Sequence, residues 1–314
     1  MFGRHFPRFA AAAALALHSL SAQQATQSVQ ARQQVGVAQN VQGGVVSSSM
    51  TSTEAYAPPS SADSDIGEQV LLQPSQKYQA FSAWTNWSVF WTNNAALLND
   101  TAGSDTFLSG TVGGSYMPYL GGNLFADFSA EQGLFRYANN GSLDFNSLEL
   151  KAGLVYVIRP LGDVALFGDY TYDMLTARGF NKEIYSDHTL SIGARKSFAI
   201  NRANLVYTST SAQFSLGGEP AYALRNEFAC LVGYQAALTR MMRFDLYYRV
   251  SAQDYTDSSR ADFNQLIGGG VSFEVTKWLT IQALSTIGIN RSTEGAYNYF
   301  AANLGGGIGI LVNF

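Results

Sequence analysis

The sequence has few charged residues, a single cysteine and no long apolar run. Only 13% of its 314 residues are charged, about half the share usual in soluble domains. With one cysteine, Cys230, an intramolecular disulfide is excluded. No run of about 18 consecutive apolar residues is present, which excludes a conventional membrane-spanning helix. The net charge of −4 and the pI of about 5.4 argue against a nucleic-acid partner.

Groups that carry catalysis or bind metals are equally scarce. Two of the three histidines lie in the first 22 residues, which leaves His188. Asp187 precedes it, but adjacent residues of a strand point to opposite faces. The glycine runs at 268–270 and 305–307 are not followed by the Lys-Ser or Lys-Thr of a phosphate loop. We therefore expect no enzyme activity, no metal site and no cofactor.

Residues 1–22 have the features of a secretory signal peptide. Arg4 and Arg8 supply the positive start, and an apolar core of about a dozen residues follows from Phe9 to Leu20. The segment closes on small residues that end at Ala22. The sequence therefore predicts export across the inner membrane and cleavage after residue 22.

Residues 23–77 form a low-complexity segment that differs from the rest of the chain. It is rich in Gln, Ser, Ala, Val and Thr and has almost no aromatic residues. Such a segment cannot bury enough apolar surface to fold by itself, although Val35 to Val46 is suited to a short helix or strand. We interpret it as a periplasmic extension or a partial plug of a lumen, and an unstructured linker is the alternative.

Residues 78–314 show apolar and polar side chains alternating with a period of two, which is the pattern of strands. Short links recur about every 40 residues and alternate with longer polar ones, as in membrane barrels. The pattern predicts an all-β fold, a transmembrane antiparallel up-and-down β-barrel of about 12 strands that follows the signal peptide and the low-complexity segment. The expected strands lie near 81–92, 105–117, 123–134, 143–158, 163–174, 184–198, 204–216, 223–238, 243–253, 262–275, 279–290 and 299–314.

The last strand carries the most specific signal. Ile308, Ile310, Val312 and the terminal Phe314 fall on one face. The segment resembles the closing strand of bacterial outer-membrane β-barrel proteins, in which these positions are read by the barrel-assembly machinery. Over residues 78–314 the chain is similar to porin-like barrels and to autotransporter β-domains as a class. The resemblance implies the outer membrane of a Gram-negative cell, with outer-membrane lipid and the assembly machinery as partners.

Aromatic residues cluster near both ends of the expected strands, as membrane interfaces favour. One band lies near the short links and the other near the longer ones. The first comprises Tyr116, Tyr119, Tyr156, Phe198, Trp278 and Phe314, and the second comprises Trp91, Tyr137, Tyr172, Tyr255, Tyr297 and Tyr299.

The charged residues of the strands mostly share the parity opposite to the apolar face, which directs them into the lumen. A charge facing lipid at the midplane would cost about 2–4 kcal/mol for Arg or Lys. The register across the 159–163 turn sets Lys151 opposite Thr171, between Asp169 and Asp173. The predicted lumen residues are Asp127, Glu131, Glu149, Lys151, Asp169, Asp173, Asp187, Arg195, Arg225, Glu227, Asp245, Arg249 and Glu274.

Three functions fit this pattern. The first is a small passive, porin-like channel for ions or small polar solutes, with a mild preference for cations because acids outnumber bases. The second is a structural or adhesive barrel whose lumen is filled by side chains. A barrel of 12 strands is intermediate between narrow barrels, which side chains can fill, and wide barrels, which leave a channel. The third is an autotransporter-like translocator.

Overall fold

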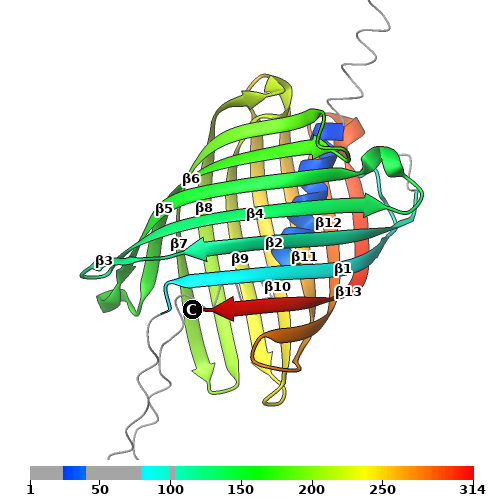
Figure 1. Ribbon diagram of the computed structural model, residues 1–314. Coiled ribbons are helices and arrows are strands. Elements are labelled where there is room, and N and C mark those ends of the chain that lie inside the picture. The colour runs from blue at the N-terminus through cyan, green and yellow to red at the C-terminus, as the bar shows by residue number, and fades with distance from the viewer. Residues whose placement is uncertain (1–23, 40–78, 100–102) are drawn as a thin grey trace, which may run out of the picture.

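The computed structural model describes residues 24–39, 79–99 and 103–314, and the predicted signal peptide lies outside these ranges. Apolar and polar side chains alternate along residues 81–313, and this part of the chain forms long strands (Figure 1). The strands are β1 (Phe81–Thr92), β2 (Asp105–Tyr116), β3 (Tyr119–Gly121), β4 (Leu124–Tyr137), β5 (Phe145–Ile158), β6 (Val164–Ala177), β7 (Glu183–Asn201), β8 (Asn204–Glu219), β9 (Arg225–Ala237), β10 (Met242–Tyr255), β11 (Ala261–Glu274), β12 (Leu279–Ser292) and β13 (Tyr299–Asn313). Four 3-10 turns join them, namely η1 (Gly141–Leu143), η2 (Arg159–Leu161), η3 (Ala221–Ala223) and η4 (Gly295–Tyr297).

The strands close into an antiparallel barrel of 12 strands, with β3 as a short extra strand against β4. Each strand pairs with its neighbour in sequence, apart from β2, which pairs with β4 beyond the short β3. Pairing of β1 with β13 closes the sheet, with Ser82 opposite Asn313. The predicted fold class is therefore confirmed, and most strand boundaries agree with the predicted ones to within three residues.

The barrel has two distinct ends. At the end we call the turn end, residues 117–123, 159–163, 202–203, 238–241 and 275–278 join the strands. The other end, which we call the loop end, carries the described residues 93–99, 103–104, 138–144, 178–182, 220–224, 256–260 and 293–298. Because β1 begins and β13 finishes at the turn end, both ends of the barrel sheet lie there.

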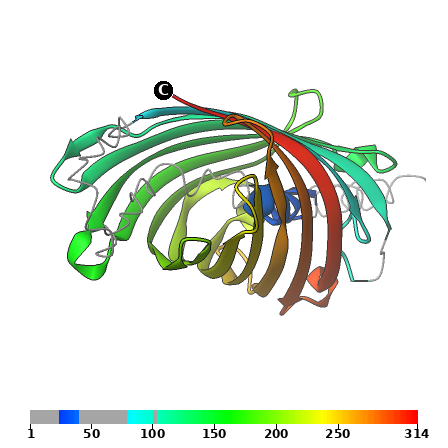
Figure 2. The same ribbon diagram turned by 90° about the horizontal axis from the view of Figure 1, so that it is seen from below.

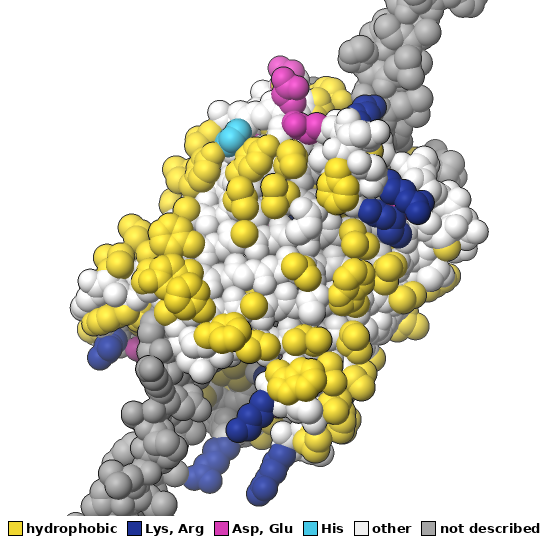
Figure 3. Space-filling model, viewed as in Figure 1, with side chains coloured by type: hydrophobic (Ala, Val, Ile, Leu, Met, Phe, Trp, Pro, Cys, Tyr) yellow, Lys and Arg dark blue, Asp and Glu magenta, His cyan; other side chains and the backbone are white. Residues whose placement is uncertain are grey.

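The two faces of the wall have the predicted character. On β1, Asn86 and Ser88 are buried, whereas Trp87 and Val89 between them are exposed. The same alternation continues around the barrel, so large apolar side chains cover its outside (Figure 3). Charged side chains on the face shown in Figure 3 gather at the ends of the barrel. An apolar outside between polar ends is the surface of a membrane-spanning barrel.

Among the residues that the structure describes, one helix interrupts the all-strand pattern. Residues 24–39 are helical and lie inside the barrel, surrounded by the curved wall (Figure 2). No helix among the described residues is long and apolar enough to cross a membrane. An isolated helix of this length is only marginally stable in water, so the barrel interior supplies the contacts that hold it. We call this element the lumen helix.

Glycines in the wall make room for inward-pointing aromatic rings. A Cβ added to Gly305 on β13 would lie 2.4 Å from both Phe90 Cδ1 and the carbonyl oxygen of Val89 on β1. The strands that close the barrel therefore approach each other where only glycine fits, and the Phe90 ring covers the gap.

The band of aromatics predicted at the loop end is corrected in part. Trp91 is exposed on the outside, but Tyr137, Tyr255 and Tyr299 are buried inside the barrel. Tyr299, the last of these three, does not face a membrane interface. Its hydroxyl accepts a hydrogen bond from Gln34 of the lumen helix. All six aromatics predicted at the turn end are exposed.

Replacing Gly305 by Ala is expected to destabilise the barrel by about 1–3 kcal/mol, because the new methyl group must displace Phe90 or move β1. The matched control is Gly295→Ala in η4, where an added Cβ meets no atom within 4 Å. Urea unfolding of the refolded proteins, followed by tryptophan fluorescence, measures the difference. Equal midpoints for the two variants would show that the strands tolerate the methyl group.

Candidate functional site in the barrel lumen

The lumen helix enters the barrel from the loop end and runs obliquely inward. At its start the Gln24 side chain donates a hydrogen bond of 2.8 Å to the carbonyl oxygen of Ser142 in η1. Near its end, Val37 lines a cavity together with Gly162 and Asp163 of the turn end. The helix therefore has a defined direction, with its N-terminus at the loop end and its C-terminus toward the turn end.

A pair of ion contacts fixes the middle of the helix. The Arg32 guanidinium donates one N–H to Glu149 on β5 and another to Asp173 on β6. The Arg32 side chain is 19% exposed, so the contacts are largely removed from water. Two acids that the sequence predicts for the lumen thus share one positive charge, which comes from the N-terminal segment. Such charge-assisted hydrogen bonds are the strongest polar contacts available to a helix of this composition.

Glutamines on the helix bind the opposite wall. Gln33 donates to both carboxylate oxygens of Glu227 on β9, at 3.1 and 3.2 Å. The Gln34 amide lies 3.2 Å from the Tyr299 hydroxyl and accepts a 3.0 Å hydrogen bond from Asn303 on β13. The helix is therefore held by β5 and β6 on one side and by β9 and β13 on the other.

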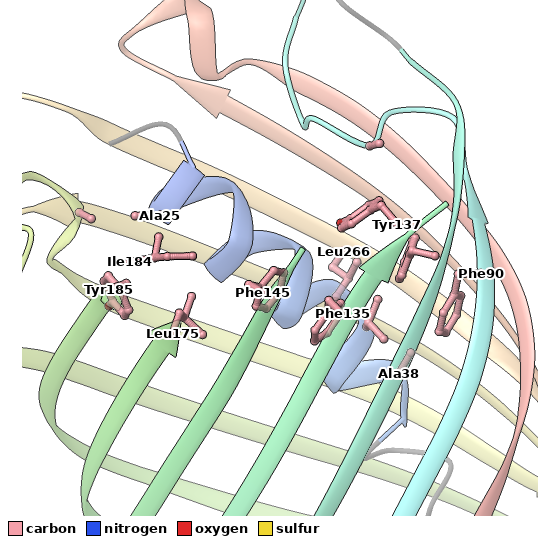
Figure 4. Close-up of a cluster of buried hydrophobic side chains, with 14 of the residues drawn as sticks. Ala25, Ala38, Phe90, Phe135, Tyr137, Phe145, Leu175, Ile184, Tyr185 and Leu266 are labelled. Atoms are coloured by element: carbon pink, nitrogen blue, oxygen red, sulfur yellow. The ribbon is translucent and has the colours of Figure 1, made fainter. Parts of the chain in front are cut away.

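Apolar contacts complete the packing at the loop end. The rings of Phe90, Phe107, Phe135 and Phe145 form a row across β1, β2, β4 and β5, with neighbouring centroids 5.4, 6.3 and 4.4 Å apart. This row and the small helix residues belong to one buried cluster (Figure 4). Ala25 and Ala38 take part in it from the helix. The loop-end half of the lumen is therefore occupied.

The turn-end half of the lumen remains open. A cavity of about 520 Å³ lies beyond the helix, and Val37 forms part of its wall. Six of the predicted lumen residues line it, namely Asp127, Lys151, Asp169, Arg195, Asp245 and Arg249. A space of this size, bounded by charged side chains, suits water and ions and is large enough for a small polar solute.

Lys151 makes an ion pair that the sequence does not predict. Its register opposite Thr171 is as predicted. Its ammonium group, however, lies 2.9 Å from Asp127 on β4, whereas Asp173 on β6 binds Arg32. Lys151 therefore pairs with β4 and not with β6, because Arg32 of the lumen helix already neutralises Asp173 on β6.

The remaining predicted residues also lie on the inner face, but not all of them meet the helix or the cavity. Glu131 accepts a 3.0 Å hydrogen bond from the Trp84 indole, and Asp187 accepts hydrogen bonds from Tyr185 and Ser215 near the loop end. Arg225 lies 3.6 Å from Glu227, which also pairs with Arg249. Glu274 pairs with Arg243 at the turn end, where both side chains are more than one-third exposed.

Sequence reasoning did not single out Arg32 or the row of phenylalanines. The phenylalanines carried a usable signal, because their parity matches the buried polar face of each strand. No sequence pattern points to Arg32, apart from its being a rare cation in a segment otherwise rich in Gln, Ser and Ala. Its partners lie more than 100 residues away in the chain.

His188 lies on the outside of the barrel, away from the lumen. Its Nδ1 is 2.5 Å from the Tyr170 hydroxyl, and its ring packs on Tyr172 at 4.8 Å. The adjacent Asp187 points inward, so the two side chains do not form a catalytic pair. Within residues 24–39, 79–99 and 103–314, no three His, Cys, Asp or Glu side chains gather as metal ligands.

Comparison with solved structures agrees with this architecture. No protein-family model and no curated protein matches the chain. An outer-membrane channel from Pseudomonas putida F1 is similar in fold, with a TM-score of 0.53 and 9% identity over 76% of this chain and 98% of that one. The NanC porin (TM-score 0.45, 9% identity, 73% and 99%) and the translocator domain of the autotransporter NalP from Neisseria meningitidis (0.40, 14%, 74% and 88%) are also similar. The predicted resemblance to outer-membrane barrels is confirmed at the level of fold.

Reversing the charge of Arg32 is expected to release the lumen helix. In Arg32→Glu, the new carboxylate faces Glu149 and Asp173, so attraction becomes repulsion. Hydrogen–deuterium exchange of the backbone amides of residues 24–39 measures the effect, and we expect exchange at least about tenfold faster, which corresponds to about 1.4 kcal/mol. Arg202→Glu, in the exposed turn between β7 and β8, is the control. Unchanged protection in Arg32→Glu would mean that the ion contacts do not hold the helix.

Proposed function

We propose that the protein is a passive outer-membrane channel that its own lumen helix holds closed. The wall supplies a polar, charged interior, and the helix blocks the loop-end half of it. In this proposal the barrel passes ions or small polar solutes when the helix leaves its site. The observation that carries the proposal is the position of Arg32, which bridges two strands of the wall from inside the lumen.

Contacts of the helix favour a removable closure over a permanent core. Arg32, Gln33 and Gln34 bind the wall through polar groups that water can replace when the helix leaves. The buried amide nitrogens of Gln30 and Gln39 have no hydrogen-bond partner among the described residues. Each unpaired buried group costs about 1–3 kcal/mol, so the helix is held less firmly than an apolar core of equal size.

The cavity favours a channel over a barrel that is filled throughout. A structural barrel of this width can pack its lumen with wall side chains alone. Here the wall leaves about 520 Å³ open at the turn end, and a separate segment occupies the rest. The filled-lumen alternative predicts no conductance whether or not the helix is held in place.

We further propose that the closing strand directs assembly into the outer membrane. The side chains of Ile308, Val312 and Phe314 are exposed on the outside of β13 and its end, where lipid and the assembly machinery can reach them. Ile310 shares their parity and is partly buried against its neighbours. The predicted signal peptide supplies the export step that precedes assembly.

Conductance across a planar bilayer tests the closure. Wild-type protein is expected to show rare openings, whereas Arg32→Glu is expected to raise the open fraction roughly ten- to a hundredfold. That range corresponds to about 1.4–2.8 kcal/mol, below the about 3–5 kcal/mol of a fully buried pair because these side chains are partly exposed. Arg202→Glu should behave as wild type. If Arg32→Glu carries no current although its barrel is shown to be folded, the result would instead support the filled-lumen alternative.

Charge reversal at Lys151 tests the proposed selectivity. In the Arg32→Glu background, Lys151→Glu removes a cation from the cavity wall and adds an anion beside Asp127. The reversal potential in a salt gradient should shift toward the cation equilibrium potential, because the field of the narrow pore becomes more negative. Lys277→Glu, exposed at the turn end, provides the charge-matched control. A reversal potential that does not differ between the two variants would remove Lys151 from the conduction path.

A further inference from the structure

Four carboxylates lie side by side on the inner face of the wall. Glu131 on β4 is directly opposite Glu149 on β5. Glu149 is in turn opposite Asp173 on β6, and Asp173 is opposite Asp187 on β7. Because neighbouring strands lie about 4.8 Å apart, the four residues span roughly 14 Å of the wall at one height. We call these four residues the acid row.

The wall provides no basic side chain at this height. The register continues from the acid row to Gly113 on β2 and to Gly218 on β8, which carry no charge. Like charges directly opposite each other on a sheet destabilise it. Among the described residues, both ion pairs that the acid row forms are with Arg32 of the lumen helix. The row therefore depends on a cation that does not belong to the wall.

A guanidinium group is bound at the centre of the acid row. Arg32 reaches this position from a segment more than 100 residues away in the chain and donates N–H groups to Glu149 and Asp173. A planar guanidinium can donate to two carboxylates on neighbouring strands at once, which an ammonium group does less well. The bound side chain thus identifies the chemical group that the centre of the row accepts.

The two ends of the acid row receive neutral donors only. Glu131 accepts a 3.0 Å hydrogen bond from the Trp84 indole. Asp187 accepts hydrogen bonds of 3.0 Å from Tyr185 and 2.6 Å from Ser215. One positive charge is therefore shared by four carboxylates, and a second cation one strand away from the first, at about 5 Å, would be favoured at either end.

The spread of the carboxylates favours an extended organic cation over a metal ion. Within residues 24–39, 79–99 and 103–314, no three His, Cys, Asp or Glu side chains gather as metal ligands. The open cavity of the turn end gives access to the row, because Lys151, two residues along β5 from Glu149, forms part of the cavity wall. The cavity volume of about 520 Å³ is large enough for a small organic solute.

We propose that the acid row is a binding site for small organic dications that carry a guanidinium group, and that Arg32 occupies this site as a built-in substitute. The inference deepens the proposed function and rests on it, because the site becomes available when the lumen helix leaves. The guanidinium of the solute lies between Glu149 and Asp173, and its second cation lies toward Glu131 or Asp187. Since the solute and Arg32 need the same carboxylates, binding of the solute weakens the hold on the helix.

Calorimetric titration of the refolded protein with agmatine, which carries a guanidinium and a primary amine, tests the site. The matched probe is N-(4-aminobutyl)urea, in which a neutral urea replaces the guanidinium. Arg32→Ala is expected to bind agmatine roughly ten- to a hundredfold more tightly than the wild type, because a competitor for the same carboxylates has been removed. The urea probe should bind both proteins much more weakly than agmatine binds Arg32→Ala.

Removal of the carboxylates locates the binding. In the Arg32→Ala background, Glu149→Gln combined with Asp173→Asn should abolish the binding of agmatine. The control combines Glu183→Gln with Asp257→Asn, which removes the same charge from exposed positions near the loop end and should leave the affinity unchanged. Equal affinities of the wild type and Arg32→Ala, equal affinities for the two probes, or equal losses in the two double substitutions would overturn the inference. Circular dichroism verifies that each barrel is folded.

Hydrogen–deuterium exchange of the unsubstituted protein gives a second measurement that does not depend on how the variants fold. Agmatine should speed the exchange of the backbone amides of residues 24–39, whereas the urea probe at the same concentration and ionic strength should not. Exchange that agmatine leaves unchanged would show that the solute does not compete with Arg32 and would overturn the inference.

Bilayer recording separates failure of this inference from failure of the proposed function. If Arg32→Glu conducts but Arg32→Ala does not distinguish agmatine from the urea probe, the inference is wrong and the channel stands. If Arg32→Ala binds agmatine selectively but no variant conducts, the binding site is supported and the channel is contradicted.

Discussion

Pairing of Arg32 with Glu149 and Asp173 is the interaction on which the position of the lumen helix depends. Two acids on neighbouring strands repel each other across a narrow interior, and a cation between them removes that penalty. The wall cannot provide this cation locally, because Lys151 is already paired with Asp127. The N-terminal segment therefore supplies it and is held in the lumen as a result.

The same wall meets opposite requirements on its two faces. Outward positions must be apolar, because lipid cannot satisfy polar groups. Inward positions must be polar enough to support a solvated cavity and apolar enough, near the loop end, to pack against a helix. In the half of the lumen that the helix occupies, the row of phenylalanines provides the apolar surface against which the helix packs. In the half that stays open, charged residues dominate the wall. This division separates a packed loop-end half of the lumen from an open turn-end half.

Most of the barrel follows from the local sequence pattern, whereas the placement of the lumen helix does not. A period of two and the alternation of links predict the strands, and the parity of Arg249 and Asp245 on β10 places them inside, as found. The lumen helix is different. Its sequence lacks the apolar surface needed to fold alone, and its contacts are with residues more than 100 positions away. The prediction of a plug for residues 23–77 was one alternative among others, and no local signal distinguishes it from a linker.

The three loop-end tyrosines that lie inside the barrel, and not in the predicted aromatic band, have a related cause. Tyr255 shares its parity with Gln253, which lies inside, although its place near the end of a strand predicts an interface residue. The statistical preference of tyrosine for membrane interfaces competes with parity at such positions. Here parity decides, because the helix turns the interior near the loop end into a packed core where tyrosine rings are buried.

Reversible tethering of the helix during bilayer recording tests the central claim most directly. Gln34→Cys and Asn303→Cys place thiols on two side chains that are joined by a 3.0 Å hydrogen bond, in the Arg32→Glu and Cys230→Ser background. A short reducible bis-maleimide then links the helix to β13, with each single-cysteine variant as control. The account predicts that the tether abolishes the steady current and that reduction of the linker restores it. A current that persists while the helix is linked to the wall would contradict the claim that this helix closes the channel.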